Sequence, residues 1–416
     1  MKNKVLYLLY LLYLGSFAQE KITLENCYDL INSNYPVSRQ TELIAEQYQI
    51  ENSIIQTEKL PKLDLAAQAT YQSEVTQVPA ASLGIEPLNK DQYRATLGIN
   101  QLLYAGGLIN AKANAKLAEQ STKQKQVEVS LHALKFQINQ LYFSILLNQE
   151  NRELLLSKQN QLLTQLKEVQ SGIKNGIVVP TSDKVIEIEL LKIDQQLFEN
   201  KTSRELLISS LVALIGKPLP TETLFSNAPI LIHKSEALRR PELDLFQFQK
   251  EEMESNQTII TKQNIPKLSA FANGGYGNPG LNALDNSFQG FYVAGVKLNW
   301  NVFDWNATKK QKQSLDVQKK IIDTQIEAFT LNNNIALDQQ QTEMNNITTF
   351  IESDLQIIEL RKEVLQTANS QLKNGVITVS AYTTELTNLY DSENALLQHK
   401  IQLELAKANY NILKGN

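Results

Sequence analysis

Two long stretches of the chain carry apolar residues at alternating steps of four and three. The first runs from Leu108 to Ser171 without glycine or proline. Its apolar series reads Val127, Leu131, Leu134, Ile138, Leu141, Ile145, Leu155, Leu162, Leu166, Val169 and Ile173. The series is interrupted only at Asn148, Arg152 and Gln159. A repeat of 3.5 residues is typical of helices that supercoil left-handedly around neighbours, so we expect one long coiled-coil helix here.

The second stretch, from Asn306 to Asn374, also lacks glycine and proline. Toward its end the same spacing returns in Ile351, Leu355, Ile358, Leu365 and Leu372. At about 1.5 Å per residue, each helix would be roughly 100 Å long. A compact globular domain has no use for such a length, so the pattern predicts helices that span a distance.

Each long stretch ends on the same three residues, Lys-Asn-Gly, at 174–176 and again at 373–375. Glycine adopts positive φ without strain, so each copy predicts the tip of a hairpin between two antiparallel helices. N-cap candidates for the return helices are residues 181–183 in the first copy and Ser380 in the second. The Ile-Gly-Lys-Pro sequence at 215–218 predicts the end of the first return helix.

Four shorter segments, at 62–73, 92–103, 267–277 and 290–302, alternate between apolar and other residues. One face carries Leu63, Leu65, Ala67, Ala69, Tyr71, Tyr93, Ala95, Leu97, Ile99, Leu268, Ala270, Ala272, Tyr276, Tyr292, Ala294, Val296, Leu298, Trp300 and Val302. The opposite face carries Asp64, Gln68, Arg94, Thr96, Gly98, Asn100, Gly295, Lys297 and Asn299. A period of two predicts β-strands with one apolar and one polar face.

Two interpretations of these strands are open. A water-soluble antiparallel sheet would bury one side, but no spare amphipathic segment is available to cover it. A transmembrane barrel would turn the apolar face to lipid and the polar face to water, which we favour. The lumen-facing residues would then be Arg94, Asn100, Lys297 and Asn299. Aromatic residues suited to the membrane interface are Tyr71, Tyr93, Tyr276, Tyr292 and Trp300.

Four strands are too few to close a barrel. An open edge in hydrocarbon leaves backbone N–H and C=O groups unpaired, at a cost of several kcal/mol each. We therefore expect several copies of the chain to share one barrel, in a number that the strands alone do not fix.

The two halves of the sequence repeat the same landmarks. Pro36 and Pro61 are 25 residues apart, as are Pro241 and Pro266, and the two Lys-Asn-Gly tips lie 199 positions apart. Independent landmarks that keep register indicate an internal duplication. The first repeat covers residues 19–218, with its helical hairpin at about 107–215, and the second covers 219–416, with its hairpin at about 306–413.

Residues 1–18 read as a secretory signal. Lysines stand at 2 and 4, an apolar run extends from Val5 to Leu14, and Ser16 and Ala18 suit a cleavage site. The run is too short to span a bilayer, although a retained anchor is the alternative. Loss of the two lysines changes the formal charge from −4 to −6. That balance speaks against nucleic-acid binding, and the single Cys27 has no partner for an internal disulfide.

Motifs for catalysis or cofactor binding are weak. Gly275-x-Gly277-x-x-Gly280 matches the glycine spacing of a dinucleotide-binding motif. A strand pattern follows it, however, where that motif requires a helix. The histidines at 132, 233 and 399 lack metal-ligand spacing. We expect no enzyme activity, no metal and no cofactor, and we expect His132 to be a packed or solvated position.

The residues resemble the TolC-type outer-membrane efflux protein family over essentially the whole chain after the signal. The markers are "RRPEL" (239–243), "LLYAGG" (102–107), "NVFDWN" (301–306) and the tips "NGIVVPTSD" and "NGVITVSAY". The second junction departs from the family's glycine pair, with Trp305-Asn306 in its place. The resemblance implies a homotrimer with a 12-stranded barrel in the outer membrane of a Gram-negative bacterium. An α-helical barrel would continue it into the periplasm.

The resemblance also implies a function. The chain would be the passive exit duct of a tripartite efflux or type I secretion system, docking onto a periplasmic adaptor that connects to an inner-membrane pump. The docking tips would be Asn175, Gly176, Ile177, Asn374, Gly375 and Val376. A non-channel periplasmic coiled-coil scaffold is the alternative. The sequence leaves the cargo open and suggests that selectivity belongs to the pump.

Many relatives close the tunnel with acidic rings on the second return helix. The matching positions here are Ala381 and Thr384, neither of which is acidic. The gate candidates by position and proximity are Asp183, Val379, Ala381, Tyr382, Thr384 and Glu385. We therefore expect the gate to respond less to divalent cations than in relatives with those rings.

Overall fold

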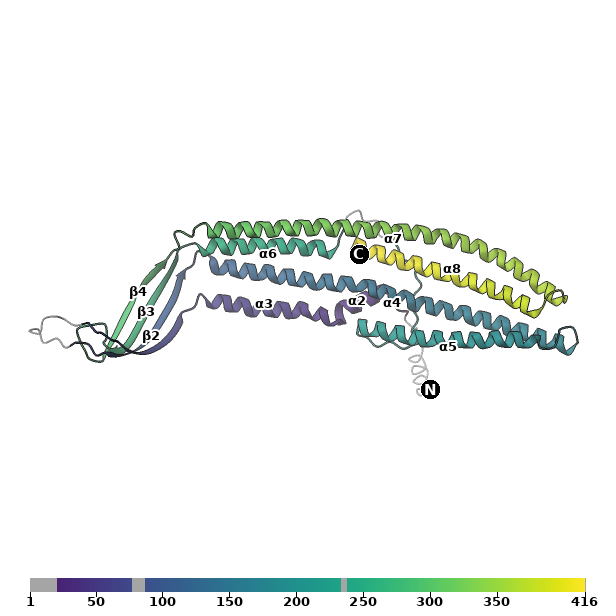
Figure 1. Cartoon of the computed structure of the whole chain (residues 1–416), viewed down its shortest axis with the longest axis horizontal. Coiled ribbons are helices and arrows are strands. Elements are labelled where there is room, and N and C mark those ends of the chain that lie inside the picture. The colour runs from purple at the N-terminus through teal and green to yellow at the C-terminus, as the bar shows by residue number, and fades with distance from the viewer. Residues whose placement is uncertain (1–20, 77–86, 233–237, 416) are drawn as a thin grey trace, which may run out of the picture. The chain divides into compact units, whose positions relative to one another are not determined.

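The structure is a computed structural model that describes residues 21–76, 87–232 and 238–415 (Figure 1). The predicted signal at 1–18 and His233 lie outside the described residues. The elements of the first repeat are α2 (Leu24–Asn34), η1 (Pro36–Arg39), α3 (Gln40–Thr57), β1 (Lys62–Tyr71), β2 (Asp91–Tyr104), α4 (Leu108–Lys174) and α5 (Ser182–Ile215). Those of the second are α6 (Pro241–Gln263), β3 (Lys267–Asn278), β4 (Gln289–Asn299), α7 (Ala307–Lys373) and α8 (Val379–Lys414). The predicted mainly α chain with a small β part is confirmed.

The two longest helices match each other in length and position. α4 and α7 each contain 67 residues. Their first residues, Leu108 and Ala307, are 199 positions apart, as are their last residues, Lys174 and Lys373. Each long helix is therefore continuous through the stretch without glycine or proline and ends where Lys-Asn-Gly begins.

The chain divides into two compact units that cut across the repeats. The helical unit comprises the described parts of Met1–Gln40, Val127–Leu243 and Ala328–Asn416. The sheet unit comprises those of Thr41–Gln126 and Asp244–Glu327. Each unit draws on both halves of the sequence, and α4 and α7 contribute residues to both units.

The sheet unit holds one antiparallel sheet in the order β1-β2-β3-β4, of which Figure 1 labels three strands. β1 and β4 are its edges, so each has a neighbour on one side only within the described chain. The last pair between β3 and β4 joins Lys267 to Asn299. Trp300 and Val302, expected to extend the fourth strand, lie beyond it because β3 has no residue left to pair with them.

The described part of the helical unit has two cores. The first lies where the N-terminal segment meets α4. Cys27 and Ile31 of α2 pack with Ile138 of α4 and Leu211 of α5, all with 4% exposure or less. The hydroxyl of Tyr142 lies within hydrogen-bond distance of the carbonyl oxygens of Ile22 (3.0 Å) and Ser226 (2.8 Å). Burial raises the pKa of the Cys27 thiol to about 12.

A second core fills the ends of the hairpins. It joins α4, α5, α7 and α8 through Leu155, Leu162, Val169, Ile186, Ile193, Ala368, Leu372, Val379, Tyr382, Leu386 and Tyr390. Val127, Ile138, Ile145, Leu155, Leu162 and Val169 of the predicted heptad series are all buried. The seam of α4 therefore faces neighbouring helices, as its 3.5-residue repeat predicts.

Two of the three interruptions in the heptad series make polar links to α5. The side-chain amide of Asn148 donates to the backbone oxygen of Asn200 (2.9 Å), and that of Asn200 donates to the backbone oxygen of Asn148 (2.9 Å). Gln159 donates to Asp194 (2.8 Å). Arg152, the third interruption, has an exposed side chain beside Glu153.

The other motifs receive structural explanations. Gly275 and Gly277 lie inside β3, and a loop follows the strand where a dinucleotide site needs a helix. His132 is buried, with Nε2 at 3.1 Å from the backbone oxygen of Ile412, as expected for a packed histidine. Within the described ranges, none of the helices has the length and apolarity to cross a membrane.

Candidate channel wall, hairpin tips and gate positions

The two hairpin tips share one backbone geometry. Gly176 has φ +69° and its N–H donates to Ile173, while the N–H of Ile177 donates to Gly172 (2.9 Å). Gly375 also has φ +69°, and the N–H groups of Gly375 and Val376 make the corresponding bonds to Leu372 and Gln371. This pair of bonds is the Schellman motif, which ends a helix on a left-handed residue.

The apolar residue after each tip glycine projects into open space. Ile177 and Val376 are each 69% exposed. A Cβ added at Gly176 or Gly375 would meet nothing within 4 Å. In the first tip Val179 is also 72% exposed. Each tip therefore presents a backbone turn with at least one exposed apolar side chain, a combination suited to a partner surface.

The two tips differ in how the return helix starts. α8 begins at Val379, with the hydroxyl of Thr378 accepting from the N–H of Ala381 (3.2 Å). Ser380, expected to cap this helix, is inside its first turn, because Thr378 already occupies the capping position. α5 begins at Ser182 after Thr181, which has φ +77° and makes no side-chain cap.

The structure separates the gate candidates into two groups. Val379 and Tyr382 are buried in the second core, where α4, α5 and α7 already surround α8. Ala381 and Thr384 lie on the exposed side of α8. Val379 and Tyr382 are therefore engaged within the chain, whereas Ala381 and Thr384 are not.

The remaining gate candidates make ion pairs. Glu385 lies 3.3 Å from Arg361 of α7, and Asp183 lies 3.6 Å from Lys184, its neighbour in sequence. Arg361 was not singled out by sequence reasoning, since its partner lies 24 positions away and only the antiparallel packing of α7 and α8 brings them together. The ion pair holds Glu385 against α7 of the same hairpin.

The apolar face of the sheet is exposed. On β2, apolar-face residues such as Tyr93 and Leu97 are exposed, and the polar-face residues Arg94 and Thr96 between them are half-buried. The side chain of Tyr292 on β4 is 83% exposed. An apolar face in this condition needs a covering that the described part of the chain does not provide.

Aromatic residues gather at both ends of the strands. Tyr71, Tyr93, Tyr276 and Tyr292 lie toward the end of the sheet where β1 connects to β2 and β3 to β4. Trp300 lies at the other end, beyond β4. Sequence reasoning missed three more exposed rings at that end: Tyr104, Phe303 and Trp305. Alternation could not find Phe303 and Trp305 because they follow the strand.

The four predicted lumen residues share the polar face. Arg94 pairs across the sheet with Gln68 and Asn100 with Lys62, while Lys297 pairs with Ser269 and Asn299 with Lys267. Directly paired residues point to the same side of a sheet. All of these side chains therefore lie opposite the apolar face.

Two phenylalanines also lie on the polar face and were missed. Phe271 pairs with Gly295, and Phe291 pairs with Gly275. A Cβ added at Gly275 would lie 2.5 Å from Cζ of Phe291, and one at Gly295 would lie 3.2 Å from Phe271. Each ring therefore occupies the space that its glycine leaves free. Both phenylalanines occupy polar-face positions of the alternating pattern, and this departure from the pattern is the sequence signal that could have found them.

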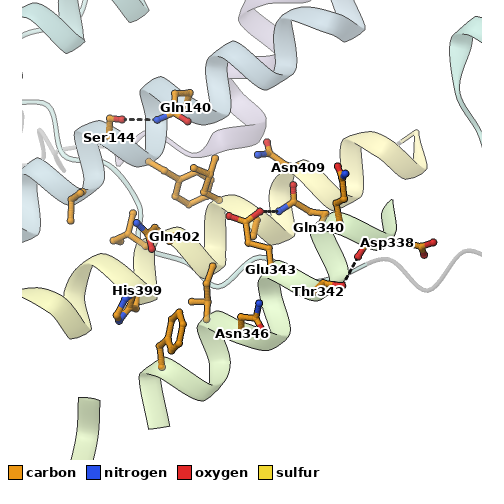
Figure 2. A pocket seen from close by; sticks show the side chains of 18 of the residues that line it. Gln140, Ser144, Asp338, Gln340, Thr342, Glu343, Asn346, His399, Gln402 and Asn409 are labelled. Atoms are coloured by element: carbon orange, nitrogen blue, oxygen red, sulfur yellow. Dashed lines mark hydrogen bonds between the residues drawn. The ribbon is translucent and has the colours of Figure 1, made fainter. Parts of the chain in front are cut away.

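A groove of about 960 Å³ lies in the helical unit between α4, α7 and α8 (Figure 2). Gln340 bonds along its own helix to Glu343 (2.7 Å), while Asn409 of α8 accepts from Asn139 of α4 (2.9 Å). At one end His399 Nδ1 lies 2.6 Å from Asp354 Oδ2. Among the described residues, no group of three or more His, Cys, Asp or Glu side chains could hold a metal ion.

Comparison with known proteins gives structural matches alone. No family model and no curated protein matches the chain. CusC, studied for its folding and transmembrane channel formation, matches with a TM-score of 0.70 and 11% identity, over 94% of this chain and 91% of that one. The outer membrane protein VceC of Vibrio cholerae matches with a TM-score of 0.65 and 16% identity, over 93% and 95%.

The open-state MtrE outer membrane channel of Neisseria gonorrhoeae matches with a TM-score of 0.64 and 17% identity, over 94% of this chain and 88% of that one. The chain has the TolC-type fold. Because these TolC-type structures cover nearly all of the chain, the sheet, both long hairpins and the connecting segments all belong to the shared fold. At identities of 11–17% these matches establish the fold and leave the roles of individual side chains to the chain's own structure.

Proposed function

We propose that this chain is the outer-membrane exit duct of a tripartite efflux or secretion system in a Gram-negative bacterium. The observation that carries the proposal is the four-stranded sheet with an exposed apolar face and two open edges. Lipid covers such a face without further protein. The solved channels that share the fold support the same interpretation.

The open edges require partners of the same kind. β1 and β4 can pair with each other between copies, and closure removes every unpaired backbone group from the hydrocarbon. We propose three copies, which give a barrel of twelve strands. The helices of the three copies then form the periplasmic tunnel, and no enzymatic step is needed.

The spacing of the aromatic residues fits a membrane. From Tyr93 to Tyr104, β2 advances eleven residues. At about 3.3 Å per residue and a tilt near 45°, that advance spans roughly 25 Å, the height of the apolar band in outer-membrane barrels. Tyr71, Tyr93, Tyr276 and Tyr292 would mark one interface, and Trp300 with Phe303 and Trp305 the other.

The hairpin tips are the proposed contact with a periplasmic adaptor. Gly176-Ile177 and Gly375-Val376 combine identical backbone turns with exposed apolar side chains. An inner-membrane pump would act through that adaptor. In the proposed duct, Ala381 and Thr384 on the exposed side of α8 remain the gate candidates that face away from the intrachain core.

The alternative is a periplasmic scaffold without a pore, and one substitution on each face of β1 separates the two functions. In a barrel, Leu65→Lys places a charge in lipid at a cost of about 2–4 kcal/mol. Ala66→Lys, the matched control, points to the polar face and should be tolerated. The measurement is heat-modifiable migration of the protein from outer-membrane fractions, together with conductance in planar bilayers. Equal behaviour of the two variants, without conductance by the native protein, would favour the scaffold.

A further inference from the structure

The polar face of the sheet carries a strong excess of positive charge. Its basic side chains are Lys62, Arg94, Lys267 and Lys297, and its acidic side chain is Asp64. The apolar face has a single charged residue, Asp91, at the loop end of β2. The whole chain has a formal charge of −4. The positive excess is therefore a local property of one surface.

Three of the four cations lie at the helical end of the sheet, which is the end where the strands connect to the helices. Lys62 begins β1 and Lys267 begins β3, while Lys297 lies two residues before the end of β4. Arg94 lies nearer the loop end, opposite Gln68. Basic groups therefore line the polar face at two depths.

These cations are not neutralised by the chain. Among the described residues, none of the four has a carboxylate within 4 Å, and the guanidinium of Arg94 lies 5.5 Å from the ring centre of Phe291. The acidic groups near the helical end have other partners. Glu58 pairs with Lys112 (2.7 Å), and Asp304 accepts from the N–H of Thr308 (3.0 Å).

One of the two phenylalanines of the polar face, Phe291, helps to hold this charge in place. Phe291 fills the space beside Gly275, and the guanidinium of Arg94 lies over its ring. A cation over an aromatic face is stabilised by the ring quadrupole, so Arg94 is held beside the wall. Three copies of the chain would repeat Arg94 and the lysines as rings around the pore.

We infer that the barrel prefers anions, so that negatively charged cargo and small anions pass it more readily than cations. This inference rests on the proposed function, because the polar face lines a pore only if the chain forms one. Rings of charged side chains set ion selectivity in pores. Their field acts over about 10 Å at 0.1 M salt, so the preference should strengthen as salt is lowered.

The test is the reversal potential of the purified native protein in planar bilayers under a potassium chloride gradient at low salt. We expect chloride to permeate at least about twice as readily as potassium, since charge rings concentrate counter-ions. In the Arg94→Gln/Lys267→Gln/Lys297→Gln variant, the chloride-to-potassium permeability ratio should fall to about one or below, because most of the positive charge is removed. The matched control, Lys267→Arg/Lys297→Arg, keeps the charge and should retain the native ratio.

Two results would overturn the inference while leaving the duct intact. One is a native channel that prefers potassium, and the other is an unchanged ratio in the glutamine variant. Absence of any conductance from correctly folded native protein would instead contradict the proposed duct and the inference with it.

Discussion

At each hairpin tip one glycine allows the chain to reverse. Gly176 and Gly375 have the same φ and the same pair of backbone bonds, although 199 residues separate them. A Cβ atom added to either glycine would have no other atom within 4 Å. Substitution at these glycines can therefore alter the tip surface while leaving the core untouched.

Placing a charge at both tips should block docking. Gly176→Asp with Gly375→Asp adds a carboxylate where an adaptor would bury it unpaired, at a cost of several kcal/mol. In a strain that lacks the native protein and expresses this variant, we expect export to be lost and outer-membrane trimers to form normally. Gly176→Asn with Gly375→Asn is the matched control, because Asn also tolerates positive φ and carries no charge. Normal export by the Asp variant would show that docking occurs elsewhere.

His132 makes the helical unit sensitive to acid. Burial, together with the positive charges of Lys135 and Arg240, lowers the pKa of His132 to about 4 from the usual 6.5. The unfolded chain therefore binds a proton before the folded chain does. The stability contributed by neutral His132 is complete above pH 6.5 and is lost as the pH falls to 4.

The size of this effect is up to about 3 kcal/mol, from about 1.4 kcal/mol for each pKa unit. Thermal unfolding of the purified protein between pH 7 and pH 4 measures it. His132→Gln removes the titrating group and keeps an N–H donor for the Ile412 oxygen, so its unfolding temperature should fall less over this range. Parallel pH profiles for the two proteins would contradict the assignment.

The tips could be predicted from the sequence, and the burial of the gate candidates could not. A Schellman turn depends on residues within one helical turn of the glycine, so Gly176 and Gly375 carry their own signal. The burial of Val379 and Tyr382 depends on α4 and α5, which are about 200 residues away in sequence. The hydroxyl of Thr378 decides the helix start ahead of Ser380 by a single hydrogen bond.

Among the elements, α4 and α5 are joined by polar groups inside an apolar seam. Asn148 and Asn200 exchange bonds with each other's backbone, yet the side-chain oxygen of each is buried without a partner among the described residues. Such a pair fixes which residues face each other, because a shifted register would leave more polar groups unpaired.

Removing one member should cost more than removing both. Asn148→Ala leaves a cavity and breaks one buried bond, so we expect a loss of about 1–3 kcal/mol. Asn148→Leu with Asn200→Leu replaces both by apolar groups of similar size, and its unfolding temperature should equal or exceed that of the native protein. Thermal unfolding in detergent compares the two. A double variant less stable than the single one would mean that the pair contributes net stability.

The long helices and the strands were predictable because each has a repeating pattern over many residues. The end of β4 was not, since its pairing stops where β3 begins at Lys267. Phe271 and Phe291 were not predicted as wall residues because they occupy polar-face positions of the alternating pattern, where apolar residues are not expected. Their cross-strand glycines, Gly295 and Gly275, become neighbours only through the register of β3 and β4.

For the whole molecule, exposed apolar rows indicate association beyond the sheet. α5 exposes Ile188, Leu191, Phe198 and Leu206. α7 exposes Leu331, Ile335, Phe350, Leu360 and Val364. A monomer would leave both rows in water, whereas adjacent copies in the proposed trimer could cover them.

A charge in the α5 row should prevent assembly. Leu191→Lys with Phe198→Lys places two ammonium groups where a neighbouring copy would exclude water, so we expect trimers to be lost. Gln196→Lys is the control, because it adds a lysine to an exposed polar position of the same helix. Native gel electrophoresis or analytical ultracentrifugation of detergent-purified protein measures the assembly. Intact trimers in the double variant would place the interface on another face.

The buried thiol of Cys27 has a practical consequence. It is the single cysteine of the chain, it is fully enclosed by α2, α4 and α5, and its pKa of about 12 keeps it protonated at neutral pH. Maleimides and spin labels react with exposed thiolates. The native sequence therefore already serves as an unreactive background, and one cysteine introduced at Ile177 or Lys297 would report alone on that position.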